Sequence, residues 1–251
     1  MILCFDAGNT MIKCGVYEDG KLIQQFAVDT DAKRSSNQFE VLLKYFVNDP
    51  KNVEGAIISS VVPDVTMVIK DAVDSLFSIN ALILNRSLKT KMKLKLDYPN
   101  ELGGDLIAGA VGAVKKYNYP VVVADFGTAT KMYVVDKNGY YIGGMIAPGM
   151  GVSMKALISN TRLLYEVPIV APKHVCGSNT KDAIQSGIVF GQAYMVSEFA
   201  RRMERELGYE LNRVVTGGFS KIVKDSIVCF AYEQNLVLDG LYEIYCLNSG
   251  K

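Results

Sequence analysis

The sequence of 251 residues contains no tryptophan, one histidine and five cysteines, and no two cysteines are spaced as Cys-x-x-Cys. A single histidine, His174, nearly excludes a histidine-based catalytic triad and a metal site with several histidines. We interpret it, two residues after Pro172, as a surface residue. The odd number of cysteines and their spacing favour reduced, buried thiols over a disulfide framework or a zinc site. These cysteines are Cys4, Cys14, Cys176, Cys229 and Cys246.

The sequence also lacks a large net charge and a long apolar run. Its formal charge is +1 and its pI is about 7.5, so electrostatics give no argument for binding nucleic acid or a membrane surface. No apolar run approaches the ~20 residues that span a bilayer. The apolar start, Met1 to Phe5, ends at Asp6 and has none of the basic residues of a signal peptide. We therefore expect a cytoplasmic globular protein.

Two short motifs each consist of an apolar strand followed by Asp-x-Gly and by hydroxyl or amide residues. One is Asp6-Ala7-Gly8-Asn9-Thr10, and the other is Asp125-Phe126-Gly127-Thr128-Ala129-Thr130. Either motif alone favours a phosphate-binding loop over an ordinary turn only weakly. The two aspartates, however, are 125 − 6 = 119 positions apart, and the same ungapped offset relates other pairs. These pairs are Gly8 and Gly127, Val16 and Val135, Gly20 and Gly139, and Ile23 and Ile142. The offset indicates a duplicated module, whose two loops could hold opposite ends of a nucleotide polyphosphate.

The remaining pattern alternates short apolar strands with amphipathic helices, which indicates an α/β protein. The segment Ser35-Ser36-Asn37 can cap a helix, and Pro63 is expected to open a second helix at a position that proline tolerates. Residues 55–62 are predicted to form a buried parallel strand, and 81–84 another short strand. The segment 161–181 is expected to be irregular. Further helices are predicted at about 107–117, 152–159 and 182–207.

Three further segments each have two interpretations. The lysine-rich stretch Lys89–Lys95 favours an exposed edge strand over a patch that steers phosphates. Asp105 follows two glycines at the start of a predicted helix, where a carboxylate can simply cap the helix. The same glycines also leave room for a ligand. Thr216-Gly217-Gly218 forms a turn whose backbone could accept a base or a ribose, although a Gly-Gly turn alone is weak evidence.

Five motifs, in this order and spacing, resemble the type III pantothenate kinase family. They are Asp-x-Gly-Asn-Thr at 6–10, Gly-x-Asp at 103–105, Asp-x-Gly-Thr-Ala-Thr at 125–130, Gly-Gly-x-Ile-x-Pro-Gly at 143–149 and Thr-Gly-Gly at 216–218. The resemblance implies the actin-like ATPase fold, with two ribonuclease-H-like halves and a cleft between them. We expect these halves at 1–117 and 118–251.

The resemblance implies ATP-dependent phosphorylation of pantothenate to 4′-phosphopantothenate, with Mg²⁺ and with K⁺ or NH₄⁺, by a homodimer. Asp105 would accept the proton, Asp125 would hold the monovalent cation, and Thr128 would contact ATP. The first phosphate loop would comprise Asp6, Ala7, Gly8, Asn9, Thr10, Met11, Ile12 and Lys13. Pantothenate would contact Gly103, Gly104, Asp105, Leu106 and Thr180.

The sequence departs from the family pattern mainly on the acceptor side. Leu106 stands where the family has arginine, which removes a fixed cation and a bidentate donor. Lys131 and Tyr133 replace the threonine and aspartate that usually follow the second loop. Leu96 occupies a tyrosine position, and Leu163-Leu164 stands for a leucine-proline pair. Two alternatives therefore stay open: a non-enzymatic nucleotide-binding relative, such as a regulator like the Bvg accessory factor, and a kinase for another small alcohol.

Overall fold

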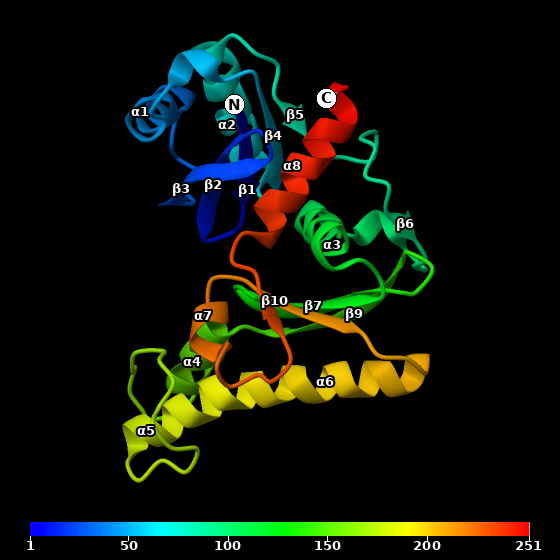
Figure 1. Cartoon of the computed structure of the whole chain (residues 1–251). Coiled ribbons are helices and arrows are strands. Elements are labelled where there is room, and N and C mark those ends of the chain that lie inside the picture. The colour runs from blue at the N-terminus through cyan, green and yellow to red at the C-terminus, as the bar shows by residue number, and fades with distance from the viewer. Residues whose placement is uncertain (251) are drawn as a thin grey trace. The chain divides into compact units, whose positions relative to one another are not determined.

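The computed structural model describes residues 1–250, which divide by their contacts into two units (Figure 1). Unit 1 comprises Met1–Met92, Asp97–Lys115 and residues 236–250. Unit 2 comprises Lys93–Leu96 and Lys116–Asn235. Each unit is built around one mixed β-sheet.

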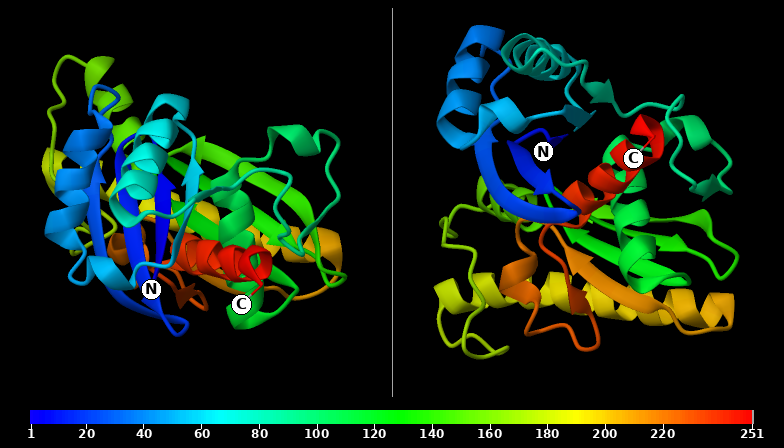
Figure 2. Two further views of the ribbon diagram at one scale, coloured as in Figure 1. Left: turned by 90° about the horizontal axis from the view of Figure 1, so that it is seen from above. Right: turned by 45° about the horizontal axis from the view of Figure 1, so that its top comes forward.

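The sheet of unit 1 has the strand order β3-β2-β1-β4-β5. Strands β1, β2 and β3 form an antiparallel meander, and β4 and β5 continue the sheet in parallel. Helices α1 and α2 pack on one face, and α3 and α8 pack on the other (Figure 2). The bounds are β1 (Ile2–Ala7), β2 (Met11–Glu18), β3 (Lys21–Asp29), β4 (Gly55–Ser60), β5 (Leu82–Ile83), α1 (Ser36–Phe46), α2 (Pro63–Phe77), α3 (Gly104–Tyr117) and α8 (Leu236–Ser249), with short 3₁₀ turns η1 (Pro50–Asn52) and η2 (Pro99–Glu101).

The sheet of unit 2 has the order β11-β10-β7-β8-β9-β6. Its first five strands repeat the topology of unit 1, because β9-β8-β7 is an antiparallel meander and β10 and β11 extend it in parallel. The duplication predicted from the 119-residue offset is thus confirmed at the level of topology. The bounds are β6 (Lys93–Leu94), β7 (Val121–Phe126), β8 (Ala129–Val135), β9 (Tyr140–Pro148), β10 (Asn212–Thr216), β11 (Ala231–Tyr232), α4 (Met150–Ser159), α5 (Thr180–Gln185), the π-helical segment η3 (Ser186–Phe190), α6 (Gly191–Leu207) and α7 (Ser220–Val223).

Local sequence signals explain most of the element boundaries. Ser35 caps α1 in a capping box with Gln38, and Pro63 is the first residue of α2. β4 is buried along its length apart from Ser60. The helix predicted at 182–207 instead runs as three consecutive helical segments, because a π-helical stretch separates α5 from α6. The lysine-rich stretch contributes β6, which is an edge strand as predicted.

The C-terminal helix α8 belongs to unit 1, whereas the sequence division at 117/118 assigned it to the second half. The reason lies in its apolar face. Leu238 and Leu241 are buried together with Ile2 and Cys4 of β1. Close helix packing adds to this, because a Cβ on Gly240 would lie 1.8 Å from the Ala108 carbonyl oxygen of α3. The last helix therefore covers apolar side chains of the first strand.

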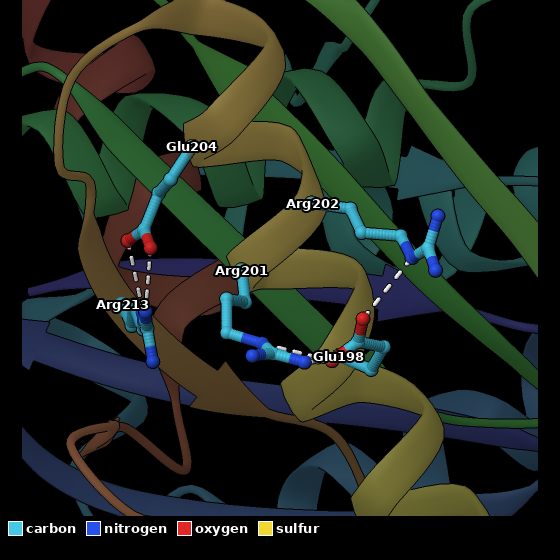
Figure 3. Close-up of polar contacts among 5 residues, drawn as sticks. All are labelled: Glu198, Arg201, Arg202, Glu204 and Arg213. Carbon is cyan, nitrogen blue, oxygen red and sulfur yellow. Dashed lines mark hydrogen bonds and ion pairs between the residues drawn. The ribbon is translucent and has the colours of Figure 1, made fainter.

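In unit 2, charged side chains join α6 to β10 (Figure 3). Arg213 Nη2 lies 2.6 Å from Glu204 Oε2, and Glu204 Oε1 also accepts a bond from the Leu211 N–H. Burial would raise the pKa of Glu204, but the bonds from Arg213 and Leu211 outweigh it, and the pKa is lowered. On the preceding turn, Glu198 pairs with Arg201 and Arg202 at the surface. The Glu204–Arg213 pair thus anchors the end of the long helix to the sheet.

The cysteines only partly follow the expectation of buried thiols. Cys4 and Cys14 are buried, and burial raises the pKa of both thiols, whereas Cys176 and Cys229 are exposed. The exposed pair lies in irregular segments outside the helices and strands, although apolar residues flank Cys229 in the sequence. Among residues 1–250, no helix combines the length and the apolar character that a bilayer crossing requires.

Candidate functional site

The first acidic loop begins at the end of β1. Asp6 faces Lys13 across the antiparallel pair with β2, and it faces Ser59 across the parallel pair with β4. Directly opposite residues share a face of the sheet, so these three side chains lie on the face that α3 and α8 cover. The chain then turns tightly, with the Gly8 N–H bonded to the Met11 carbonyl at 3.0 Å. The turn leaves Asn9 and Thr10 exposed.

The loop Gly103-Gly104-Asp105 opens α3 on that same face. A Cβ on Gly103 would lie 2.6 Å from Asp105 Oδ1, so the carboxylate folds back over the glycine at the N-terminus of the helix. The helix dipole favours a negative charge there. A Cβ on Gly104 would lie 3.1 Å from Ser59 Oγ. Ser59 is therefore next to both predicted loops of unit 1: it neighbours Asp6 in the sheet and contacts the start of α3.

Sequence reasoning missed Ser59. Its side chain is 1% exposed, and among the described residues its hydroxyl has no hydrogen-bond partner. Leaving a buried hydroxyl unpaired costs about 1–3 kcal/mol, so such a group in a folded protein calls for an explanation. A ligand or an ordered water in this corner would supply the partner. The available signal was the pair Ser59-Ser60, two polar residues at the end of a buried strand.

In unit 2, the backbone of the second acidic loop packs against the backbone at Gly149. The Gly127 N–H donates to the Ala129 carbonyl at 3.1 Å, and the Gly149 N–H donates to the Thr128 carbonyl at 3.0 Å. A Cβ on Gly149 would lie 2.3 Å from that carbonyl oxygen, so only glycine fits. The last glycine of the Gly-Gly-x-Ile-x-Pro-Gly motif therefore packs directly against the backbone of the loop, and Thr128 stays exposed.

Asp125 is held between two neighbouring strands of unit 2. Lys131 lies opposite it on β8, and the Lys131 ammonium is 3.0 Å from Asp125 Oδ2. On the other side, a Cβ on Gly217 would lie 2.4 Å from Asp125 Oδ1, and Gly217 has φ +101°. The two side chains of the ion pair are only 13% and 18% exposed, for Asp125 and Lys131 respectively. The carboxylate is thus confined on both sides.

The other threonine of this loop has a structural role. Thr130 is fully buried, and its hydroxyl donates to the side-chain oxygen of Gln192 on α6. The Gln192 amide nitrogen then donates to the Pro148 carbonyl at 2.7 Å. This bridge ties β8, the end of β9 and α6 together. Sequence reasoning had not singled out Gln192, because a glutamine in a helix carries no specific signal.

The predicted site residues fall into two groups. Asp6 to Lys13 and Gly103 to Leu106 come together in unit 1, whereas Asp125, Thr128 and Thr180 lie in unit 2. Thr180 is exposed at the first position of α5, where the Asn179 side chain caps the helix through the Asp182 N–H. Within residues 1–250, no three His, Cys, Asp or Glu side chains gather closely enough to hold a metal ion. Mg²⁺ in such enzymes commonly keeps several waters and is held by one or two carboxylates together with substrate phosphates.

Two repeated sheets of order 3-2-1-4-5, each with an acidic Gly turn after its first strand, are characteristic of the actin-like ATPase fold. A family model described as type III pantothenate kinase matches residues 2–202. A type III pantothenate kinase from Roseiflexus castenholzii is 39% identical over 99% of both chains, and one from Roseiflexus sp. strain RS-1 is 38% identical over the same shares. The chain belongs to the type III pantothenate kinase family.

Two solved structures agree on the fold. A Baf family protein from Campylobacter jejuni superposes with a TM-score of 0.62 at 19% identity, covering 99% of this chain and all of that one. The activator of 2-hydroxyisocaproyl-CoA dehydratase from Clostridium difficile, with bound ADPNP, gives a TM-score of 0.58 at 14% identity, covering 99% and 94%. At such identities the similarity extends to the fold alone.

Proposed function

We propose that this chain catalyses the ATP-dependent phosphorylation of pantothenate to 4′-phosphopantothenate, the first step of coenzyme A biosynthesis. The observation that carries the proposal is 39% identity over 99% of both chains with a type III pantothenate kinase. The loop geometry supports it. Both acidic loops form tight turns, and Gly104 and Asp105 begin helix α3. Such chemistry depends mainly on positioning and on neutralising phosphate charge.

On the acceptor side, Asp105 would take the proton of the pantothenate hydroxyl. Its place in the first turn of α3, with no Cβ on Gly103 or Gly104, leaves the carboxylate approachable. Leu106 is half-buried and offers no charge to the pantothenate carboxylate. The backbone of Gly103 and Gly104, together with Thr180, would then provide the remaining contacts to the acceptor.

On the phosphate side, the turn formed by Asp6 to Lys13 would receive the phosphates through backbone N–H groups. Asp6 would orient bound Mg²⁺, which supplies charge neutralisation when present. In unit 2, the exposed Thr128 would contact ATP. We propose further that units 1 and 2 are two ribonuclease-H-like repeats.

We also propose that the protein acts in the cytoplasm as a homodimer. The resemblance implies the dimer, and unit 2 offers a surface suited to it. The irregular stretch before α5 exposes four large apolar residues, of which Leu163 is 90% exposed. The others are Tyr165, Val170 and Val175.

The test is a coupled assay for ADP release with and without pantothenate. We expect release to require pantothenate, and Asp105→Asn to lower kcat by about 10²–10⁴-fold, the usual range for a lost general base. Asp71→Asn is the control, because Asp71 is an exposed aspartate of α2, eight residues past the start of that helix. Wild-type turnover that is unchanged without pantothenate would refute the proposal. ADP release with other alcohols would identify a different acceptor, and nucleotide binding without any turnover would identify a non-enzymatic relative.

A further inference from the structure

The resemblance implies a monovalent cation at Asp125, and the residues present do not fit one there. The Asp125 carboxylate already pairs with an ammonium group, since Lys131 Nζ lies 3.0 Å from Oδ2. A potassium ion at the same oxygen would lie beside a like charge, where both side chains of the ion pair are largely buried. The other oxygen, Oδ1, is flanked by the backbone at Gly217.

We propose that the Lys131 ammonium is a built-in replacement for the monovalent cation, so that this enzyme works without potassium or ammonium ions. The expected effect on catalysis rests on the proposed kinase function. The expected effect on cation binding rests only on the geometry of Asp125 and Lys131.

The register of the sheet places Lys131 next to Asp125. Asp125 and Lys131 are directly opposite on β7 and β8, so their side chains project from the same face of the sheet. That face is opposite to the one on which Val122, Ala124 and Phe126 pack in the core of unit 2. The Lys131 ammonium therefore reaches the carboxylate without displacing any core residue.

The chemistry of the two cations is similar enough for exchange. A lysine ammonium is a compact unit charge with three N–H donors on a flexible stem. Because it is tethered to β8, its local concentration does not depend on the salt in solution. A free ion, in contrast, must be recruited and dehydrated for each binding event. Lys131 would thus offset the negative charge of Asp125 and would keep the second loop in its nucleotide-binding shape.

Salt substitution provides the first test. ATP turnover with pantothenate is measured in KCl and in tetramethylammonium chloride at equal ionic strength. We expect wild-type kcat/KM to agree within about twofold between the two salts. Lys131→Thr supplies an oxygen ligand and frees the carboxylate, so its kcat/KM should fall by about tenfold or more in tetramethylammonium and recover in KCl, a typical size for coupling between two ligands. Lys131→Met, similar in length but uncharged, should lose activity with weaker recovery.

Lys70→Met is the matched control, because Lys70 forms a comparably buried ion pair with Asp74 on α2, away from both loops. Loss of that pair should lower stability without creating any dependence on potassium. A structural role of Lys131 alone would give the same result as this control: a lower Tm in both salts and no rescue by KCl.

Thermal unfolding with a non-hydrolysable ATP analogue provides a second measurement that does not need turnover. A cation that binds the folded state raises Tm by mass action. We expect KCl to raise the Tm of Lys131→Thr above its value in tetramethylammonium chloride, and to leave the wild type unchanged. A KCl-specific rise in the wild type, or potassium-activated wild-type turnover, would overturn the inference. If pantothenate is not phosphorylated at all, the proposed function fails, while the unfolding measurement still decides the role of Lys131.

Discussion

The Gly217→Ala substitution tests whether the second loop depends on the close approach of strand β10 to Asp125. A methyl group at position 217 would lie 2.4 Å from Asp125 Oδ1 and 2.5 Å from the Phe126 backbone nitrogen. Gly217 also has φ +101°, a conformation that residues with a side chain rarely adopt. The added methyl group therefore meets two separate obstacles at the same residue.

The expected cost follows from these two obstacles. A strained backbone conformation costs about 1–3 kcal/mol, and forcing an extra methyl group into packed surroundings costs about 1–3 kcal/mol more. For a chain of about this size, 1 kcal/mol lowers Tm by about 2–4 °C. We therefore expect a fall of at least about 4 °C. We also expect weaker ATP binding, since a displaced Asp125 carboxylate would no longer face Lys131.

The neighbouring glycine provides the control. A Cβ on Gly218 would meet nothing within 4 Å, and its φ is not positive. Gly218→Ala should therefore change the free energy of unfolding by less than about 1 kcal/mol. Thermal unfolding of both variants, followed by calorimetric titration with ATP, makes the comparison. Equal Tm values for the two variants would refute the reasoning, because only the contact with Asp125 and the backbone conformation distinguish them.

Three further outcomes are expected. Ser59→Ala removes a buried, unpaired hydroxyl, so Tm should stay the same or rise by the equivalent of about 1 kcal/mol. We expect kcat/KM for pantothenate to fall. A clear loss of Tm would show that the hydroxyl is paired through water. Thr130→Val leaves the Gln192 side-chain oxygen unsatisfied and should cost about 1–3 kcal/mol in urea unfolding, and an unchanged midpoint would contradict the bridge to Pro148. The lowered pKa of Glu204 stabilises the fold above its unfolded pKa and loses this effect as the pH falls. Glu204→Gln should therefore cost about 1.5–3 kcal/mol at neutral pH, and the difference from wild type should shrink below about pH 4.3; a constant difference would exclude the ion pair as its cause.

The fold could be predicted from the sequence because its signals are local and repeated. The buried run at 55–60, the capping box at Ser35 and Pro63 at the start of α2 each depend on a few neighbouring residues. The placement of α8 could not be found in this way. Its burial depends on β1, more than 230 positions earlier in the chain, and on glycine contacts between α3 and α8 that leave no periodic pattern.

The candidate site divides in the same manner. The glycine turns and their acids were identifiable from spacing, and the structure forms each of them. The supporting residues were not identifiable: Ser59 is notable only because its hydroxyl is buried without a partner, and Gln192 only because it bridges Thr130 and Pro148. Such roles depend on which strands lie side by side, and no local sequence pattern indicates that arrangement.

Lys131 is the clearest example of a residue whose position could not be predicted, because the sequence repeat aligns it with a residue that is not its structural equivalent. At the offset of 119, Lys131 corresponds to Ile12 and Lys13 corresponds to Met132, so Lys131 reads as an isolated departure from the family. In the sheets, however, Lys13 faces Asp6 and Lys131 faces Asp125. The turn of the second copy is one residue shorter, since Asp6 and Lys13 are seven positions apart and Asp125 and Lys131 are six. Both halves therefore place a lysine opposite the aspartate in the sheet, and in the second half the Lys131 ammonium lies 3.0 Å from Asp125 Oδ2.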